Sequence, residues 1–136
     1  VARRQLIRKG LAARSYRDVI REAAMLVAVG TGDASFVATV DSLVPASAFA
    51  ARGLAVYASR GDGDAMDRLV ARLNDSRAYV RQWMVDGIKG EMPQDVIRTK
   101  LGPRLGDVKD AKVKEELEKV LAPAPAGDRA ESSGSP

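Results

Sequence analysis

The sequence of 136 residues contains neither cysteine nor histidine. Without cysteine the chain has no disulfide framework and no cysteine-based zinc site. Without histidine it lacks the commonest general base and the commonest metal ligand. Catalysis by Ser-His-Asp or Cys-His arrangements and HExxH zinc chemistry are therefore excluded, and we expect no metal, no cofactor and no enzymatic activity.

Aromatic residues and long apolar runs are scarce as well. Only 4% of the residues are aromatic, and no apolar run reaches the roughly 18 residues that cross a bilayer. We therefore expect no membrane partner. No signal peptide is visible and the first residue is Val1, so the compartment stays open, with the cytoplasm favoured. Because the chain starts in the middle of the repeat described below, we interpret it as trimmed or as a fragment of a longer array.

The apolar residues that are present favour closely packed helices. Hydrophobic residues make up 46% of the chain, enough for a core. With so few aromatic side chains, this core must consist of alanine, valine and leucine. We therefore predict tight packing between helices, with small residues where the helices cross.

A unit of about 30 residues recurs along the chain. Each unit has a basic anchor after a small or apolar residue, and the separations between anchors are 31, 29 and 33 residues. A leucine lies eight to ten residues before each anchor, where it closes the apolar face of the preceding helix. The anchors are Arg21, Arg52, Arg81 and Lys114.

Turn signals recur in the same register. A glycine lies nine residues after each of the first three anchors, at Gly30, Gly61 and Gly90. Glycine adopts the left-handed conformation that ends a helix, so we predict a turn at each of these positions. Asp33 and Asp64 follow twelve residues after the first two anchors, where an aspartate can cap the next helix. The segment Gly61-Asp62-Gly63-Asp64 also resembles the start of a calcium loop, but the later ligands are missing, so a capped turn is favoured.

Two helices in a repeat of this length are typical of an α-solenoid. We predict helices at residues 3–14, 16–29, 34–43, 47–59, 65–74, 78–89, 94–101 and 110–121, with an irregular bend at Gly102-Pro103. The domain predicted from this pattern covers residues 1–121. Residues 122–136 are rich in proline, alanine, glycine and serine, and we predict a disordered tail there.

The repeat resembles HEAT repeats, in particular the short bacterial HEAT-like kind. The match is best over residues 69–81, LVARLNDSRAYVR, in which Asp75 and Arg81 occupy the positions of the family's structural aspartate and arginine. The resemblance covers roughly residues 3–121 and implies an all-α fold, a right-handed α-solenoid of stacked antiparallel helical hairpins with about eight helices. The other units lack the aspartate, so the ladder of Asp–Arg contacts is expected to be incomplete; the corresponding residues are Ser15, Ala46 and Val108.

The function predicted from this architecture is a non-catalytic scaffold for protein–protein interaction. The resemblance implies that second helices line a concave surface, where the four anchors can form a basic stripe that binds an acidic segment of a partner protein. Alternatively, the anchors make contacts within the turns. Tyr79 and Trp83 are further candidates for the partner site, although a single tryptophan in this position more often packs in the core or between repeats.

Two other functions remain as alternatives. The net charge is +4, and residues 1–21 hold seven basic residues against one acidic residue, a pattern that fits binding to a nucleic-acid backbone or a solubilised terminal face. The resemblance also includes bacterial HEAT-like lyases that attach bilins, and glycosylases of this architecture. No cluster of residues in the sequence supports such a reaction.

Overall fold

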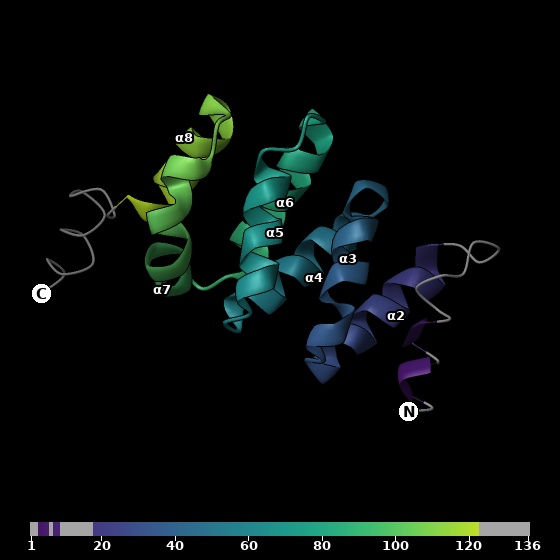
Figure 1. The fold of residues 1–136 in the computed structure, drawn as a ribbon. Helices are drawn as coiled ribbons and strands as arrows, with labels where there is room; N and C mark the ends of the chain where they lie inside the picture. The colour runs from purple at the N-terminus through teal and green to yellow at the C-terminus, as the bar shows by residue number, and fades with distance from the viewer. Residues whose placement is uncertain (1–2, 6, 9–17, 123–136) are drawn as a thin grey trace, which may run out of the picture.

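The computed structural model describes residues 3–5, 7–8 and 18–122. Within these residues the chain is helical and contains no strand, which confirms the all-α prediction (Figure 1). The α-helices are α2 (Asp18–Thr31), α3 (Val37–Leu43), α4 (Ala48–Ser59), α5 (Gly63–Leu73), α6 (Ala78–Glu91), α7 (Gln94–Val96) and α8 (Ala111–Leu121). Single 3-10 turns at Ala34–Phe36 and Val44–Ala46 flank α3.

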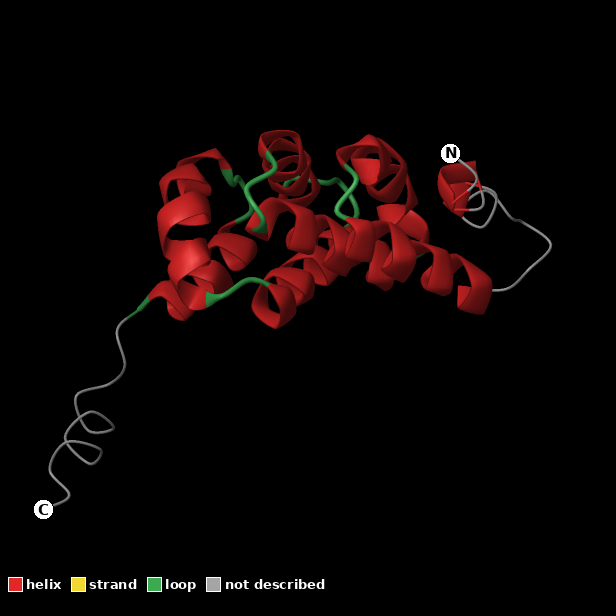
Figure 2. Cartoon of the chain, turned by 90° about the horizontal axis from the view of Figure 1, so that it is seen from below, coloured by secondary structure: helices red, strands yellow, loops and turns green. Residues whose placement is uncertain are grey.

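Helices that alternate along the chain lie next to one another. The helix α4 contacts α2 and α6, and α6 in turn contacts α8; α3 contacts α5. Each of α3 and α5 also packs against the helix that follows it, α4 and α6 respectively. In Figure 1 the elements follow one another across the molecule in chain order, and Figure 2 shows the same elongated arrangement from below. We call α2, α4, α6 and α8 the second-helix row.

Most of the buried core residues are alanine, valine and leucine, as the composition predicts, but all four methionines, Phe36 and Tyr57 are buried as well. Two buried glycines mark the crossings within the second-helix row. A Cβ atom on Gly53 of α4 would lie 3.0 Å from the Val29 side chain of α2. A Cβ atom on Gly87 of α6 would lie 3.2 Å from the backbone of Ala51 in α4. The prediction of small residues at helix crossings is therefore confirmed.

Aspartates cap several helices. Asp33 accepts a hydrogen bond from the Ser35 amide at 2.9 Å, and Asp110 accepts one from the Val113 amide at 3.0 Å. Bonds from Ser35, the side chain first and the backbone second, lower the pKa of Asp33, and the bond from the Val113 amide lowers the pKa of Asp110. The cap of α5 is Asp62, which accepts a bond from an amide in the first turn at 2.8 Å. The sequence predicts Asp64 near this position, but Asp64 lies inside the first turn of the helix.

The predicted turn glycines have different outcomes. Gly61 lies in the turn between α4 and α5 with a φ of 96°. The turn predictions for Gly30 and Gly90 are wrong, because both residues lie inside helices. The helix α2 continues past Gly30 to Thr31, and Gly32, with a φ of 69°, supplies the left-handed residue instead. The helix α6 ends at Glu91 because Met92 precedes a proline, which favours the extended backbone found there.

The segment between α7 and α8 is irregular, as predicted at Gly102-Pro103. A π-helical turn at Ile97–Leu101 leads into a 3-10 helix at Gly102–Asp107, so the chain stays helical beyond the predicted end at residue 101. Proline is tolerated at the start of such a turn, where its missing N–H needs no partner. The predicted tail lies outside the described residues from residue 123 on, and so does Ser15, with most of the helix predicted at residues 3–14.

Candidate functional site

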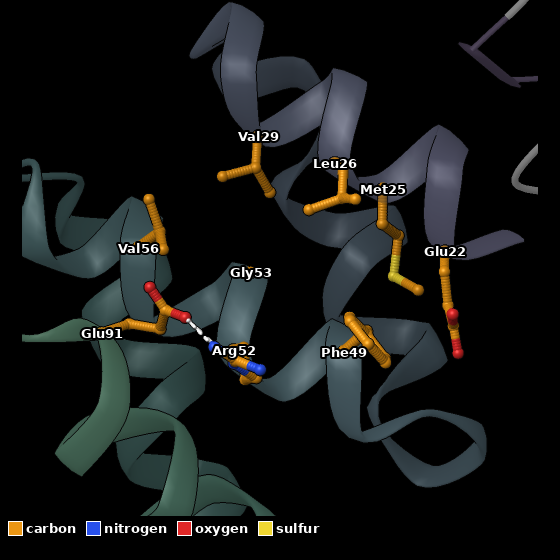
Figure 3. A pocket seen from close by; sticks show the side chains of 9 residues that line it. All are labelled: Glu22, Met25, Leu26, Val29, Phe49, Arg52, Gly53, Val56 and Glu91. Atoms are coloured by element: carbon orange, nitrogen blue, oxygen red, sulfur yellow. Dashed lines mark hydrogen bonds and ion pairs between the residues drawn. The ribbon is translucent and has the colours of Figure 1, made fainter. Parts of the chain in front are cut away.

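A groove lined mainly by apolar side chains lies between α2 and α4 (Figure 3). It encloses about 500 Å³ of space, part of it open solvent. Its walls carry the side chains of Met25, Leu26 and Val29 from α2, and of Phe49 and Val56 from α4. We call this feature the α2–α4 groove.

The shape of the groove follows from where the two helices touch. At Gly53 the absent side chain lets α4 approach Val29 of α2 closely. Toward the start of both helices the larger residues Met25 and Phe49 stand between them (Figure 3). Leu26 remains 65% exposed and Phe49 39% exposed. Both side chains line the groove, so apolar surface that water can reach faces the space between α2 and α4.

Charged groups stand at two edges of the groove. Arg52 of α4 forms an ion pair with Glu91 at the end of α6, at 2.6 Å, and its guanidinium lies 5.9 Å from the ring centre of Phe49. Glu22 of α2 lies at the opposite edge, beyond Met25 and Phe49 (Figure 3). The groove therefore has an apolar floor between an Arg–Glu pair and a separate carboxylate.

Arg52 is one of the basic residues predicted to form a stripe, and the structure places these residues in different surroundings. Arg81 donates a hydrogen bond to the backbone oxygen of Asp75 at 2.7 Å and lies 3.4 Å from the carboxylate of Asp110 in the next hairpin. Lys114 is partly buried on α8. Arg21 belongs to α2, but its side chain lies outside the described residues. Arg52 and Arg81 thus each bind an acidic group of the chain itself.

The predicted aromatic pair lies on α6. The rings of Tyr79 and Trp83 meet edge to face, with their centres 4.9 Å apart. Tyr79 is 46% exposed and its hydroxyl donates to the backbone oxygen of Pro45 at 2.8 Å. Trp83 is partly buried and packs against the core. The pair therefore joins α6 to the turn after α3 and leaves mainly Tyr79 for contact with a partner.

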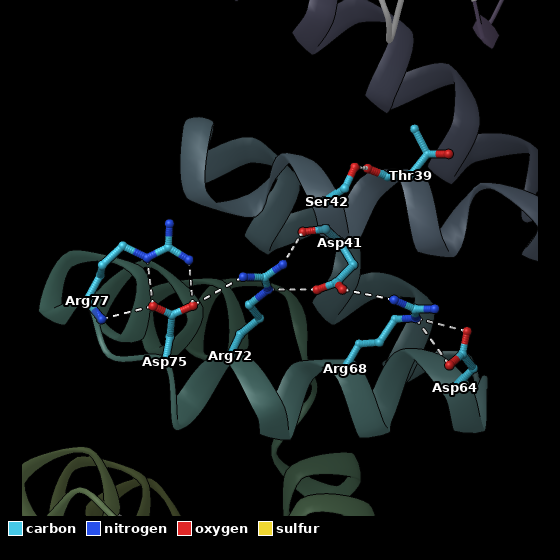
Figure 4. Close-up of polar contacts among 8 residues, drawn as sticks. All are labelled: Thr39, Asp41, Ser42, Asp64, Arg68, Arg72, Asp75 and Arg77. Carbon is cyan, nitrogen blue, oxygen red and sulfur yellow. Dashed lines mark hydrogen bonds and ion pairs between the residues drawn. The ribbon is translucent and has the colours of Figure 1, made fainter.

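Asp75 belongs to a polar network that links two hairpins (Figure 4). Its carboxylate accepts bonds from the Arg77 backbone and side chain, and from Arg72. These bonds, those of Arg77 first, hold the pKa of Asp75 well below its usual range. The predicted contact between Asp75 and Arg81 runs through the backbone oxygen of Asp75 instead, since its carboxylate is already occupied by Arg77 and Arg72.

The sequence did not single out the centre of this network, Asp41. Asp41 of α3 accepts bonds from Arg68 at 3.0 Å and from Arg72 at 2.8 Å, both on α5. Arg72 also donates to the backbone oxygen of Asp41 at 2.9 Å. The separation of 31 residues between Asp41 and Arg72 equals one repeat, and this was the available signal. The arrangement joins neighbouring hairpins and pairs the carboxylate of Asp41 with two arginines.

Other chemistry finds little support in the described residues. They contain no group of three or more acidic side chains that could hold a metal ion, and none of their helices is long and apolar enough to cross a bilayer. Comparison with known proteins adds no relative, because no family model, curated protein or solved structure matches the chain significantly. A functional interpretation therefore depends on the geometry of the chain itself.

Proposed function

We propose that the chain is a non-catalytic scaffold for protein–protein interaction that binds a segment of a partner protein in the α2–α4 groove. The observation that carries this proposal is the exposure of Leu26 and Phe49 on the two sides of one groove. Apolar residues placed in a concave surface with a few polar groups at its edge are typical of binding sites.

The architecture we propose is a right-handed α-solenoid of HEAT-like hairpins. The contacts of α4 with α2 and α6, and of α6 with α8, support this arrangement, since a solenoid packs each repeat on its neighbours. The Asp41–Arg72 contact, one repeat apart, supports it as well. The right-handed sense of the superhelix stays a prediction from the resemblance.

The groove favours a segment with one large apolar side chain and an acidic residue beside it. The apolar side chain would fill the space between Leu26 and Phe49. Arg52 uses its Nε and Nη2 atoms for a single oxygen of Glu91, and a guanidinium has further N–H groups that can bind a second carboxylate. Arg52 is the predicted stripe residue that lines the groove, so it is the one that would bind the acidic residue of the partner.

A random peptide library displayed on phage and selected on the folded chain tests this proposal. We expect enriched peptides to share a large apolar residue close to an acidic residue. Synthetic peptides of this kind should lose at least about tenfold in affinity for Phe49→Ala and for Arg52→Ala. Arg98→Ala, a change at an exposed position of the segment after α7, is the matched control and should bind normally. Enriched peptides that bind Phe49→Ala as well as wild type would overturn the proposal.

The alternative of nucleic-acid backbone binding has no observation in its favour among the described residues. Backbone binding needs several cations that are available to phosphates. Arg4 instead pairs with Asp33 at 2.6 Å, and Arg68 and Arg104 also pair with aspartates. Nine of the arginine and lysine side chains that the structure describes form ion pairs with carboxylates of the chain, so these charges are used internally.

A further inference from the structure

The helix α2 has a second apolar surface, separate from the groove. Ile20, Ala23, Val27 and Gly30 are all exposed. None of these four residues lines the α2–α4 groove. Their spacing of three, four and three residues places them along one line of the helix, as in the seam of a two-helix pair. We call these four residues the α2 seam.

The seam is unusual because it carries no charge. By the helical period, the charged positions 18, 21 and 22 lie on the other side of α2. Apart from these charged positions, which lie within its first five residues, α2 is apolar both on the side that packs against α4 and on the side of the seam. An apolar helix face is normally covered by another surface.

Gly30 adds an independent observation. It lies within α2 and is not among the glycines with positive φ, and a Cβ atom there would meet nothing within 4 Å. Neither a turn nor packing inside the chain requires glycine at this position. Glycine within a helix nevertheless costs about 1 kcal/mol relative to alanine. A helix from outside the chain that packs closely over this position would account for the glycine.

The order of large and small residues in the seam identifies that occupant. Two α2 helices can be placed antiparallel about a two-fold axis level with residue 25. The numbers of two facing residues then add up to 50. Ile20 then faces Gly30 of the other copy, and Val27 faces Ala23. Every large residue of the seam meets a small one, as closely packed helices require, and no charge is brought near a like charge.

We propose that two copies of this chain associate through their α2 seams, in an antiparallel pair with Ile20 opposite Gly30 and Val27 opposite Ala23. The pair continues the second-helix row across the two-fold axis, so that α2 gains a neighbour on the side away from α4. A two-fold interface uses the same surface on both copies, which the seam satisfies by its own sequence. One helix pair buries less than about 1,000 Å², so we expect a weak dimer.

Sedimentation equilibrium from about 1 µM to about 1 mM protein tests the pairing, because a weak dimer forms at the upper end of this range. We expect wild type to dimerise and Ala23→Val, which sets valine against valine, to weaken the dimer at least about tenfold. Val27→Ala should weaken it several-fold through lost packing. The double variant A23V/V27A restores one large and one small residue at each contact, and should recover the wild-type dissociation constant to within about threefold.

The swap also distinguishes this pairing from nonspecific association of apolar surfaces. Both positions are exposed in the single chain, so circular dichroism should show that all variants fold. A double variant as weak as Ala23→Val, or an Ala23→Val variant as strong as wild type, would overturn the pairing. A wild-type chain that stays monomeric at the highest concentration would also overturn the pairing. The α2 seam would then be a surface for a different protein. Because neither residue lines the groove, peptide binding by the α2–α4 groove should persist in all variants.

Discussion

At the scale of single residues, arginine–aspartate contacts hold the turns and join the hairpins. Arg72 contacts Asp41 of the preceding hairpin and Asp75 of the following turn, and its side chain is only 18% exposed. Hydrogen bonds to charged groups contribute more to stability than neutral ones when both partners are largely buried. The loss of one partner leaves the others with unmatched charge.

We expect Asp75→Ala to lower the free energy of unfolding by about 1–2 kcal/mol, because it removes the acceptor of several bonds in the turn before α6. Urea denaturation followed by circular dichroism measures this change. Asp67→Ala is the matched control, since Asp67 is 69% exposed and pairs only with Arg104, and it should cost less than about 0.5 kcal/mol. Equal losses in the two variants would show that the Asp75 network adds no stability.

The lowered pKa of Asp75 predicts that the stability of the folded chain depends on pH in the acidic range. Because the pKa of Asp75 is lower in the folded chain than in the unfolded chain, its stabilising effect is complete above pH about 4 and is lost as the pH falls toward the folded pKa. Urea midpoints measured from pH 7 to pH 3 should fall below pH about 4 in wild type, and fall less in Asp75→Asn. Parallel curves for the two proteins would contradict the role of this group.

At the scale of helices, close approach decides which glycines matter. Gly87 and Gly90 lie three residues apart in α6, but only Gly87 faces the backbone of α4. Sequence spacing drew attention to Gly90, whereas the packing shows that Gly87 has the structural role.

We expect Gly87→Ala to lower the melting temperature, because the added Cβ atom lies about 3.2 Å from the Ala51 backbone, which cannot rotate away. Gly90→Ala has open space and a helical backbone, so it should raise stability by up to about 1 kcal/mol. Thermal unfolding of both variants provides the comparison. A higher melting temperature for Gly87→Ala as well as for Gly90→Ala would show that α4 and α6 are not in close contact at Gly87.

The sequence predicted the structure best at the scale of helices. The apolar spacing and the anchors predicted α4, α5, α6 and α8 to within two residues at each end. The sequence placed two turns wrongly. Glycine often ends a helix, so Gly30 and Gly90 were predicted as turns, but the neighbouring residues Gly32 and Pro93 determine where the two helices end. The α2–α4 groove was not predicted, since it depends on the angle between two helices. The one signal in the sequence was that α2 is apolar on more than one side.

At the scale of the whole molecule, the basic composition and the folded surface lead to different expectations. The net charge of +4 alone permits nucleic-acid binding. In the folded chain, however, Arg52 and Arg81, two of the four predicted stripe residues, bind Glu91 and Asp110. Each of these arginines already has an internal carboxylate beside it, which reduces the positive charge available to attract a phosphate backbone.

We therefore expect no measurable binding to a short DNA duplex at low salt, and this can be checked by fluorescence anisotropy at two salt concentrations. If the stripe does bind phosphates, affinity at the lower salt concentration will be tight and will fall steeply at the higher one. Tight, salt-dependent binding would contradict the proposed protein scaffold and indicate that the chain binds nucleic acid.

The central claim is that a partner segment binds between α2 and α4. Amide chemical shifts in the ¹⁵N-labelled chain, recorded with and without a selected peptide, test it most directly. We predict that the largest shifts lie at Leu26, Val29, Phe49 and Gly53, with little change in α8. Largest shifts around Arg81 and Lys114, or none in α2 and α4, would contradict the claim and move the partner site elsewhere on the molecule.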